Sequence, residues 1–350
     1  MKTLTQNAIN LLQELIQTPS FSREENNTGD LIQNWLEGRD ITTRRIQNNI
    51  IAFNKHQDPS KPYILLNSHH DTVRPNKAYT KDPFKPIIEE GKLFGLGSND
   101  AGGALVSLMA LFVHFYEAEN LNYNLVIAAT GEEENSGPNG LKGILSELPD
   151  FSFAIVGEPT LMQLAIAEKG LVVFDAYING TPSHAAHPNK DNPIAKVPEV
   201  IQWFESLKFD RISETLGEVK LTLTELHAGK QHNAVPEKVH LVIDVRVNDR
   251  YTNAEIVEIL GNAPCEVHYR SLDLNSSAIP SEHPLVQAGL RLGKTTYGSP
   301  TLSDQAALSC PSLKMGPGDS TRSHTADEFI YLNEIEEAIP LYIEMLNSIL

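Results

Sequence analysis

The sequence predicts an α/β fold with a mostly parallel sheet, helices on both faces and an inserted, ferredoxin-like α+β domain. Short apolar runs bounded by glycine and polar residues are typical of buried parallel strands, and they alternate here with helical patterns. Near Gly170 the pattern changes to longer runs in which apolar and polar residues alternate. At 350 residues the chain is long for one core, so two domains are expected.

The first half of the chain alternates helices and strands. Residues 4–16 place apolar side chains at helical spacing and stop at Thr18-Pro19, so they predict a helix, and residues 28–36 predict a second one. A longer helix is expected over 101–118, which contains the longest apolar stretch. Buried strands are expected over residues 63–67, 92–97, 125–130 and 153–156.

The inserted domain is expected over residues 169–275. Runs over 171–178, 219–226 and 239–247 fit an antiparallel sheet with one wet face. Helices are expected over 194–207, where Pro198 predicts a break or a late start, and over 252–260. This β–α–β–β–α–β order is typical of a ferredoxin-like domain. Residues 1–168 and 276–350, closed by a helix over 332–350, would form the other domain.

The charge of the chain limits its partners. It carries 28 Lys and Arg against 45 Asp and Glu, a formal net charge of −17. No basic run is available for phosphates, so nucleic acid and anionic membrane surfaces are not expected as partners. Cys265 and Cys310 lack metal or redox spacing, and no apolar signal core or membrane-length stretch is seen. A cytoplasmic protein is expected.

Acidic groups and histidines follow the apolar runs. The carboxyl ends of parallel strands meet at one edge of a sheet, where the functional crevice of open α/β folds lies. One sheet would therefore bring two imidazoles and three carboxylates together, a donor set that suits two divalent metal ions. Taken singly, each has an ordinary explanation as a loop histidine, a helix cap or a solvated acid. The five residues are His69, Asp100, Glu134, Glu158 and His324.

Two neighbours of this set have expected roles. Asp71 lies two residues after His69, where a carboxylate can fix the tautomer of a metal-binding imidazole. Within Glu132-Glu133-Glu134, a ligand at Glu134 leaves Glu133 free to act as a general base. The register one residue earlier, with Glu132 as base and Glu133 as ligand, is the open alternative.

The ordered motifs resemble those of a known enzyme family. The chain is similar to the di-zinc metallopeptidases that include acetylornithine deacetylase, succinyl-diaminopimelate desuccinylase, aminoacylase and glutamate carboxypeptidase. The resemblance covers nearly the whole chain. Its motifs, in order, are SHHDTV, GKLFGLGSNDAGG, ATGEEENSG, VGEPT, GTPSHAAHP, NAVP, DVR and GPGDSTRSHTADE.

The resemblance implies two zinc ions, for which cobalt can substitute. His69, Asp100 and Glu158 would hold one ion, and Asp100, Glu134 and His324 would hold the other. The family also implies a cis peptide bond after the bridging aspartate, which here is Asp100–Ala101.

The resemblance further implies roles for residues around the metals. Asp71 would orient a histidine ligand, and Glu133 would be the general base and then the acid that protonates the leaving amine. His184 would donate to the oxyanion, from its own or a partner subunit, and Asn233 and Arg246 would contact the substrate carboxylate. These last three residues also have ordinary alternatives. His184 could be a turn residue, Asn233 a turn former and Arg246 a surface partner of Asp244.

The motifs look most like the acetylornithine deacetylase branch, so the expected reaction is release of acetate from N-acetyl-L-ornithine in arginine biosynthesis. Open alternatives are N-acetylcitrulline, N-succinylornithine or N-succinyl-diaminopimelate as substrate, a dipeptidase or carboxypeptidase, and a binding protein without turnover. The expected partners are a small N-acyl amino acid and a second copy of the chain, in a homodimer formed through the inserted domain, which would also be a lid.

Overall fold

A computed structural model describes residues 2–350, which form two compact units. The first contains the chain up to Ile166 together with Ala278–Tyr297 and Ser303–Leu350, and the second contains Ala167–Ser277 and Gly298–Leu302. Each unit has its own apolar core.

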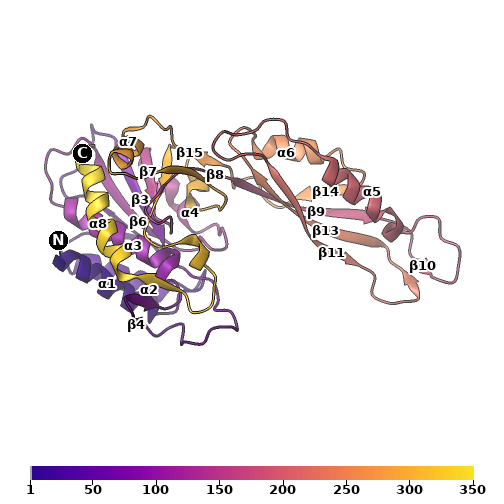
Figure 1. Ribbon diagram of the computed structural model, residues 1–350, viewed down its shortest axis with the longest axis horizontal. Coiled ribbons are helices and arrows are strands. Elements are labelled where there is room, and N and C mark those ends of the chain that lie inside the picture. The colour runs from indigo at the N-terminus through magenta and orange to yellow at the C-terminus, as the bar shows by residue number, and fades with distance from the viewer. Residues whose placement is uncertain (1) are drawn as a thin grey trace. The chain divides into compact units, whose positions relative to one another are not determined.

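The first unit is built on the large sheet, of order β1-β2-β6-β3-β7-β17-β8-β15, with β16 paired to β8 (Figure 1). Its centre is parallel, because β3 pairs in parallel with β6 and β7, and β7 with β17. The strand bounds are β1 Thr43–Ile46, β2 Asn49–Phe53, β3 Tyr63–His69, β6 Asn124–Thr130, β7 Phe151–Val156, β8 Leu164–Glu168, β15 Ser277–Ala278, β16 Thr296–Ser299 and β17 Ser312–Lys314.

Helices cover both faces of this sheet, which confirms the predicted α/β class. On one face α1, α3 and α8 lie side by side, and their apolar residues share the main core (Figure 1). The short α4 and the turn η3 contribute to a smaller core on the other face. The bounds are α1 Lys2–Ile16, α2 Asn26–Glu37, α3 Gly103–Phe115, α4 Leu141–Ile144, η2 Leu145–Glu147, α7 Pro284–Arg291, η3 Asp304–Ala307, η4 Ser320–Arg322 and α8 Leu332–Asn347.

One predicted strand is wrong in both length and place. Residues 92–97 were expected as a parallel strand of the main sheet. The structure instead has the short strand β5 (Lys92–Phe94) between β18 (Phe329–Tyr331) and β4 (Ile87–Glu89), all antiparallel, in a separate sheet. The chain then turns at Gly95 and Gly97, both with positive φ. Asp100 therefore reaches the site from a turn before α3.

The second unit has a four-stranded antiparallel sheet of order β11-β13-β9-β14 and two helices, α5 and α6. The chain order β9-α5-β11-β13-α6-β14 is the predicted ferredoxin-like order. One face of the sheet carries the core, and a separate pair, β10 and β12, holds a loop. The bounds are β9 Gly170–Asn179, β10 Ser183–His184, α5 Pro193–Ser206, β11 Lys220–Ala228, β12 Ala234–Val235, β13 Lys238–Val247, α6 Asn253–Leu260 and β14 Glu266–Tyr269.

Helix α5 corrects the expectation for Pro198, which neither breaks nor delays it. The helix starts at Pro193, before Pro198, and continues through it. The Asn192 side chain caps the first turn by accepting the Ile194 N–H at 3.0 Å. Pro198 lies near this start, where the helix loses one backbone hydrogen bond but keeps its buried contacts at Val200 and Phe204.

Among residues 2–350, no helix combines the length and apolar character needed to cross a bilayer.

Candidate active site

Three neighbouring parallel strands end at the same edge of the main sheet, and acidic or imidazole side chains follow each of them. His69 is the last residue of β3, and β6 ends at Thr130, directly before the loop that carries Glu133 and Glu134. Glu158 follows the end of β7. The parallel register of β3 with β6 and β7 places these groups together, as predicted from their positions.

Asp100 joins the group from the turn before α3. The peptide bond between Asp100 and Ala101 is cis, as the resemblance implied. The backbone N–H of Asp100 donates to Glu328 Oε1 at 2.9 Å, and the N–H groups of Asn99 and Gly97 donate to the same carboxyl at 2.8 and 3.0 Å. The buried Glu328 carboxyl thus accepts three backbone hydrogen bonds from this turn.

His324 comes from the loop between η4 and β18. Its Nε2 lies 2.9 Å from Glu134 Oε2 and 3.8 Å from Asp100 Oδ2. Residue 324 has φ +58°, in the left-handed region that non-glycine residues rarely adopt. The structure therefore brings together all five residues expected as metal ligands.

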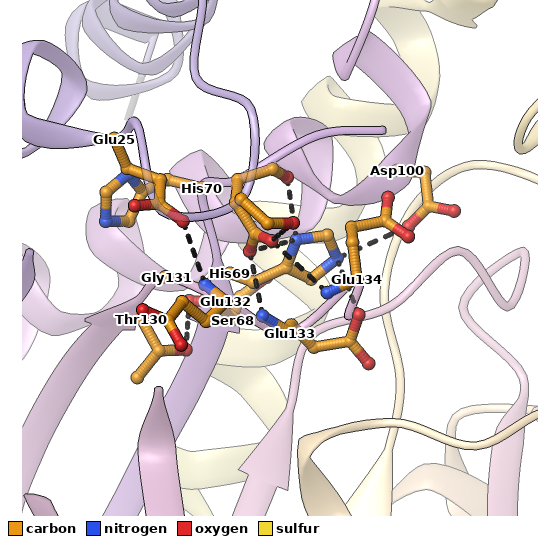
Figure 2. A network of polar contacts seen from close by, with 12 residues as sticks. Glu25, Ser68, His69, His70, Asp100, Thr130, Gly131, Glu132, Glu133 and Glu134 are labelled. Atoms are coloured by element: carbon orange, nitrogen blue, oxygen red, sulfur yellow. Dashed lines mark hydrogen bonds and ion pairs between the residues drawn. The ribbon is translucent and has the colours of Figure 1, made fainter. Parts of the chain in front are cut away.

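The imidazole of His69 is buried, with one nitrogen bonded and the other not. Nδ1 lies 3.0 Å from the carbonyl oxygen of Asp71 and 3.4 Å from its carboxylate, so the nearer acceptor is the carbonyl. A proton on Nδ1 leaves the Nε2 lone pair directed toward carboxylates, as Figure 2 shows for Asp100. Among residues 2–350, Nε2 has no hydrogen-bond partner, and it lies 3.4 Å from Asp100, 3.7 Å from Glu158 and 3.9 Å from Glu133.

The carboxylate of Asp71 holds the glutamate loop. It accepts the backbone N–H groups of Glu133 and Glu134 at 3.1 and 3.2 Å. It also accepts the Ser22 hydroxyl at 2.7 Å. Asp71 is fully buried, so these contacts satisfy both of its oxygens. It therefore positions Glu133 and Glu134 as well as His69.

Glu132 is turned away from the group. Its carboxylate accepts the Asn139 side-chain amide at 2.8 Å and the Asn139 backbone N–H at 3.3 Å. Its own N–H donates to the buried Glu25 at 3.1 Å (Figure 2). This geometry supports the register in which Glu133 and Glu134, and not Glu132, face His69.

Burial and mutual repulsion oppose the ionisation of two carboxyl groups at this point, Glu133 and Glu158. Burial raises the pKa of Glu158 to about 8, with His69 opposing and Asp100 adding to the shift. Burial likewise raises the pKa of Glu133, against the attraction of His69 and together with repulsion from Glu158. Although burial opposes it, contacts with Asp100 and Asp71 raise the pKa of His69. These carboxylates thus favour a positive charge at this point.

The donor set fits a pair of divalent metal ions. One ligand atom each from His69, Asp100 and Glu134 lie within 4.8 Å of one another, and so do atoms from His69, Glu133 and Glu158. His69 Nε2 is buried and faces carboxylates 3.4–3.9 Å away, a position at which a cation would satisfy both the nitrogen and the carboxylates. Imidazole and carboxylate together are the ligands of catalytic zinc sites.

The three remaining predicted residues belong to the second unit. His184 in β10 pairs with Ala234 in β12, and Ala185 N–H donates to the Asn233 carbonyl at 3.0 Å, so His184 and Asn233 lie in neighbouring segments. Arg246 in β13 makes a two-point contact with Asp244, through Nε at 2.9 Å and Nη2 at 3.1 Å. This contact matches the ordinary alternative for Arg246, and it uses only one edge of the guanidinium group.

Three polar residues near the site, of which Asn99 and Glu328 are buried, were not expected from the sequence. Asp304 accepts the Thr130 hydroxyl at 2.7 Å, and burial raises its pKa to about 6. Glu328 holds the Asp100 turn, and Asn99 binds the backbone of Asp319. Glu328 lies in the HTADE motif, which marks it only as an acid, and nothing near Asp304 or Asn99 indicates a contact more than 170 residues away.

Comparisons with known proteins agree with this geometry. Residues 65–348 match the model of peptidase family M20/M25/M40. A succinyl-diaminopimelate desuccinylase of Helicobacter pylori (strain Shi470) is 28% identical, with 84% of this chain and 83% of that protein covered. Another, from Cereibacter sphaeroides (strain KD131 / KCTC 12085), is 25% identical and covers 97% of both chains.

Solved structures share the fold at low sequence identity. The aminopeptidase PepT of Bacillus cereus has a TM-score of 0.77 at 17% identity, covering 99% of this chain and 98% of that one. The YXEP protein of Bacillus subtilis, described as a dinuclear metal binding peptidase from the M20 family, has a TM-score of 0.73 at 17% identity and covers 100% and 99% of the chains.

The fold, the site and the comparisons together define a metal-dependent hydrolase that acts on amides. The family match spans most of the sequence, and the chain belongs to peptidase family M20/M25/M40.

Proposed function

We propose that this enzyme removes the acyl group from an N-acyl amino acid. The observation that carries the proposal is the convergence of His69, Asp100, Glu134, Glu158 and His324 around a buried imidazole nitrogen that lacks a partner. Paired divalent metals with a neighbouring carboxylate base are suited to hydrolysis of an unactivated amide.

We assign His69, Asp100 and Glu158 to one metal position and Asp100, Glu134 and His324 to the other. Asp100 is the residue common to both, and its oxygens lie 3.4 Å from the His69 ring and 3.8 Å from the His324 ring. Divalent metals in such a site act as Lewis acids toward the amide oxygen and supply a nucleophile at neutral pH. Zinc is the proposed metal, with cobalt as a substitute.

Glu133 is the proposed general base and acid. Its carboxylate lies 3.9 Å from His69 Nε2 at the centre of the group, and its backbone is held by Asp71. It takes a proton from the attacking water while the oxygen adds to the amide carbon. It then delivers that proton to the nitrogen as the C–N bond breaks, so that a carboxylic acid and a free amine are formed.

The second unit supplies the proposed oxyanion and carboxylate contacts. His184 Nδ1 accepts the Ala186 N–H at 3.1 Å, so its neutral ring carries the proton on Nε2. This proton is the proposed donor to the oxyanion. Asn233 and Arg246 are the proposed contacts for the substrate carboxylate, and Asp244 keeps the Arg246 guanidinium in a fixed orientation.

A homodimer through the second unit is also proposed. The exposed strand β11 forms one end of its sheet order and offers unpaired backbone groups to a second copy. Light scattering of the eluted protein should give a mass near twice the 38.7 kDa of one chain. A monomer at micromolar concentration would contradict this.

Two substrates have specific support. The succinyl-diaminopimelate desuccinylases are similar along most of their length, which favours N-succinyl-diaminopimelate. The VGEPT and GPGDSTRSHTADE motifs favour N-acetyl-L-ornithine. Both are N-acyl amino acids with a free carboxylate, so the same proposed metal centre and carboxylate contacts could act on either one.

The test is a metal-dependent deacylation panel. Protein stripped with chelator and reloaded with Zn²⁺ or Co²⁺ is given N-succinyl-diaminopimelate, N-acetyl-ornithine, N-acetyl-citrulline, N-succinyl-ornithine and simple dipeptides. Metal-dependent release of one amino acid from its acyl derivative supports the proposal and identifies the substrate. Hydrolysis of dipeptides alone, or turnover that survives metal removal, overturns it.

The Glu133→Gln variant tests the proposed role of Glu133 as the general base. Loss of the base should lower kcat about 100- to 10,000-fold while zinc binding stays normal, because Glu133 is not in the proposed ligand set. Full turnover by Glu133→Gln would refute the role of Glu133.

A further inference from the structure

The side chain of Asn99 joins the two segments that carry Asp100 and His324. Its Oδ1 accepts the backbone N–H of Asp319 at 3.0 Å, and its Nδ2 donates to the carbonyl oxygen of Asp319 at 3.0 Å. Nδ2 also lies 3.3 Å from the hydroxyl of Ser323, the residue before His324. Asn99 is fully buried, so these bonds form away from competing water.

The backbone at Gly318 is shaped to receive this amide. Gly318 has φ +92°, and a Cβ at this position would lie 2.5 Å from Asn99 Oδ1 and 3.2 Å from Asn99 Cγ. Only glycine allows the chain to approach Asn99 this closely. The contact therefore depends both on the amide of Asn99 and on the glycine at position 318.

His324 depends on its backbone for its position. Its side chain is 56% exposed, so few neighbours pack around the ring. Its left-handed φ is unfavourable for a residue other than glycine and persists only where the surroundings hold it. The hydrogen bonds from Asn99 to Asp319 and Ser323 hold the segment of chain that directly precedes His324.

We propose that Asn99 is a positioning residue for His324 and sets the metal affinity of the position formed by Asp100, Glu134 and His324. This inference rests on the proposed metal centre. The Asn99 side chain is occupied by Asp319 and Ser323 and contributes no ligand atom. The position formed by His69, Asp100 and Glu158 keeps its affinity when the Asn99 side chain is removed, because backbone bonds hold His69 and Glu158. His69 is paired within β3, and the residues on either side of Glu158 are held by the Gly157 N–H on Asn67 and the Thr160 N–H on Gly316, none of which uses the Asn99 side chain.

The loop keeps a second anchor in the absence of the Asn99 side chain. Arg322 makes a two-point contact with Glu334 of α8, at 2.8 and 3.0 Å. An Asn99→Ala protein therefore retains a folded loop, and its defect is a partial loss of affinity at one metal position. Replacement of groups that orient a metal ligand typically weakens binding by about 10- to 100-fold.

Asn124 provides the matched control. It is a buried asparagine at the opposite end of β6, and its amide ties a loop in the same way. Its Oδ1 accepts the Asp58 N–H at 2.8 Å, and its Nδ2 donates to the carbonyls of Asp58 and Lys61 at 2.8 and 3.0 Å. Asn124→Ala removes as many hydrogen bonds as Asn99→Ala, far from the metal ligands.

The experiment is a competitive zinc titration of the full chain against a chromophoric chelator, repeated with Co²⁺ to follow its visible absorption. Wild-type protein and Asn124→Ala should each bind two equivalents with the same affinities. Asn99→Ala should bind the first equivalent normally and the second about 10- to 100-fold more weakly. Wild-type affinity for both equivalents in Asn99→Ala, or equal weakening of both, overturns the inference. Failure of the wild type to bind two equivalents would instead refute the metal centre.

Discussion

The Glu328→Gln substitution tests how the fold holds the bridging aspartate. Glu328 is 2% exposed, and its two oxygens accept three backbone N–H groups from the turn that carries Asp100. A glutamine keeps one oxygen for the N–H groups of Asn99 and Asp100. Its NH₂ group then faces the N–H of Gly97, which loses its acceptor. A buried donor left without a partner costs about 1–3 kcal/mol.

We therefore expect Glu328→Gln to lower the free energy of unfolding of the metal-free protein by about 1–3 kcal/mol. Because Asp100 is common to both proposed metal positions, both zinc affinities should fall by about 10- to 100-fold. Urea denaturation and chelator competition measure the two effects. Glu255→Gln is the control, since Glu255 accepts the Thr252 N–H at an exposed helix start in the second unit. Unchanged stability and zinc affinity in Glu328→Gln would show that Glu328 does not hold the Asp100 turn.

Three further predictions follow from the fold. Arg270 most strongly, and also His240, hold the pKa of Asp175 well below its usual range, although burial opposes them. The stabilisation that Asp175 provides is therefore present above about pH 4 and is lost as the pH falls further. In urea melts from pH 2 to 6, Asp175→Asn should weaken the fall in the free energy of unfolding as the pH is lowered. An unchanged pH dependence would contradict this. Phe112→Ala, in the core of α3, should destabilise the protein by about 3–5 kcal/mol in the same assay, and a loss below about 1 kcal/mol would be inconsistent with its burial. Chelator treatment should lower Tm and added zinc should restore it, whereas an unaffected Tm would argue against metal bound to the folded state.

Much of the scaffold could be predicted because its signals are local. The buried strands β3, β6 and β7 are continuous apolar runs that end in polar residues, and their parallel pairing places those ends together. The alternation along β9 predicted an antiparallel sheet with one covered face, and its burial alternates accordingly.

The sequence signals failed where tertiary contacts decide the outcome. The run over residues 92–97 is apolar, but it pairs with β18, more than 200 residues away, rather than with the main sheet. Pro198 lies inside a helix because the cap at Asn192 and the buried contacts outweigh one lost hydrogen bond. The contact between Glu328 and Asp100 spans 228 positions and leaves no periodic trace. Residue spacing gave the grouping of the ligands, whereas their division between two metals came from the resemblance.

The most direct test of the metal centre is anomalous diffraction at the zinc edge from crystals of zinc-loaded protein. Two peaks are expected in each chain, one bound by His69, Asp100 and Glu158 and the other by Asp100, Glu134 and His324. A single peak, peaks held by other residues or no peak in crystals grown with excess zinc would contradict it.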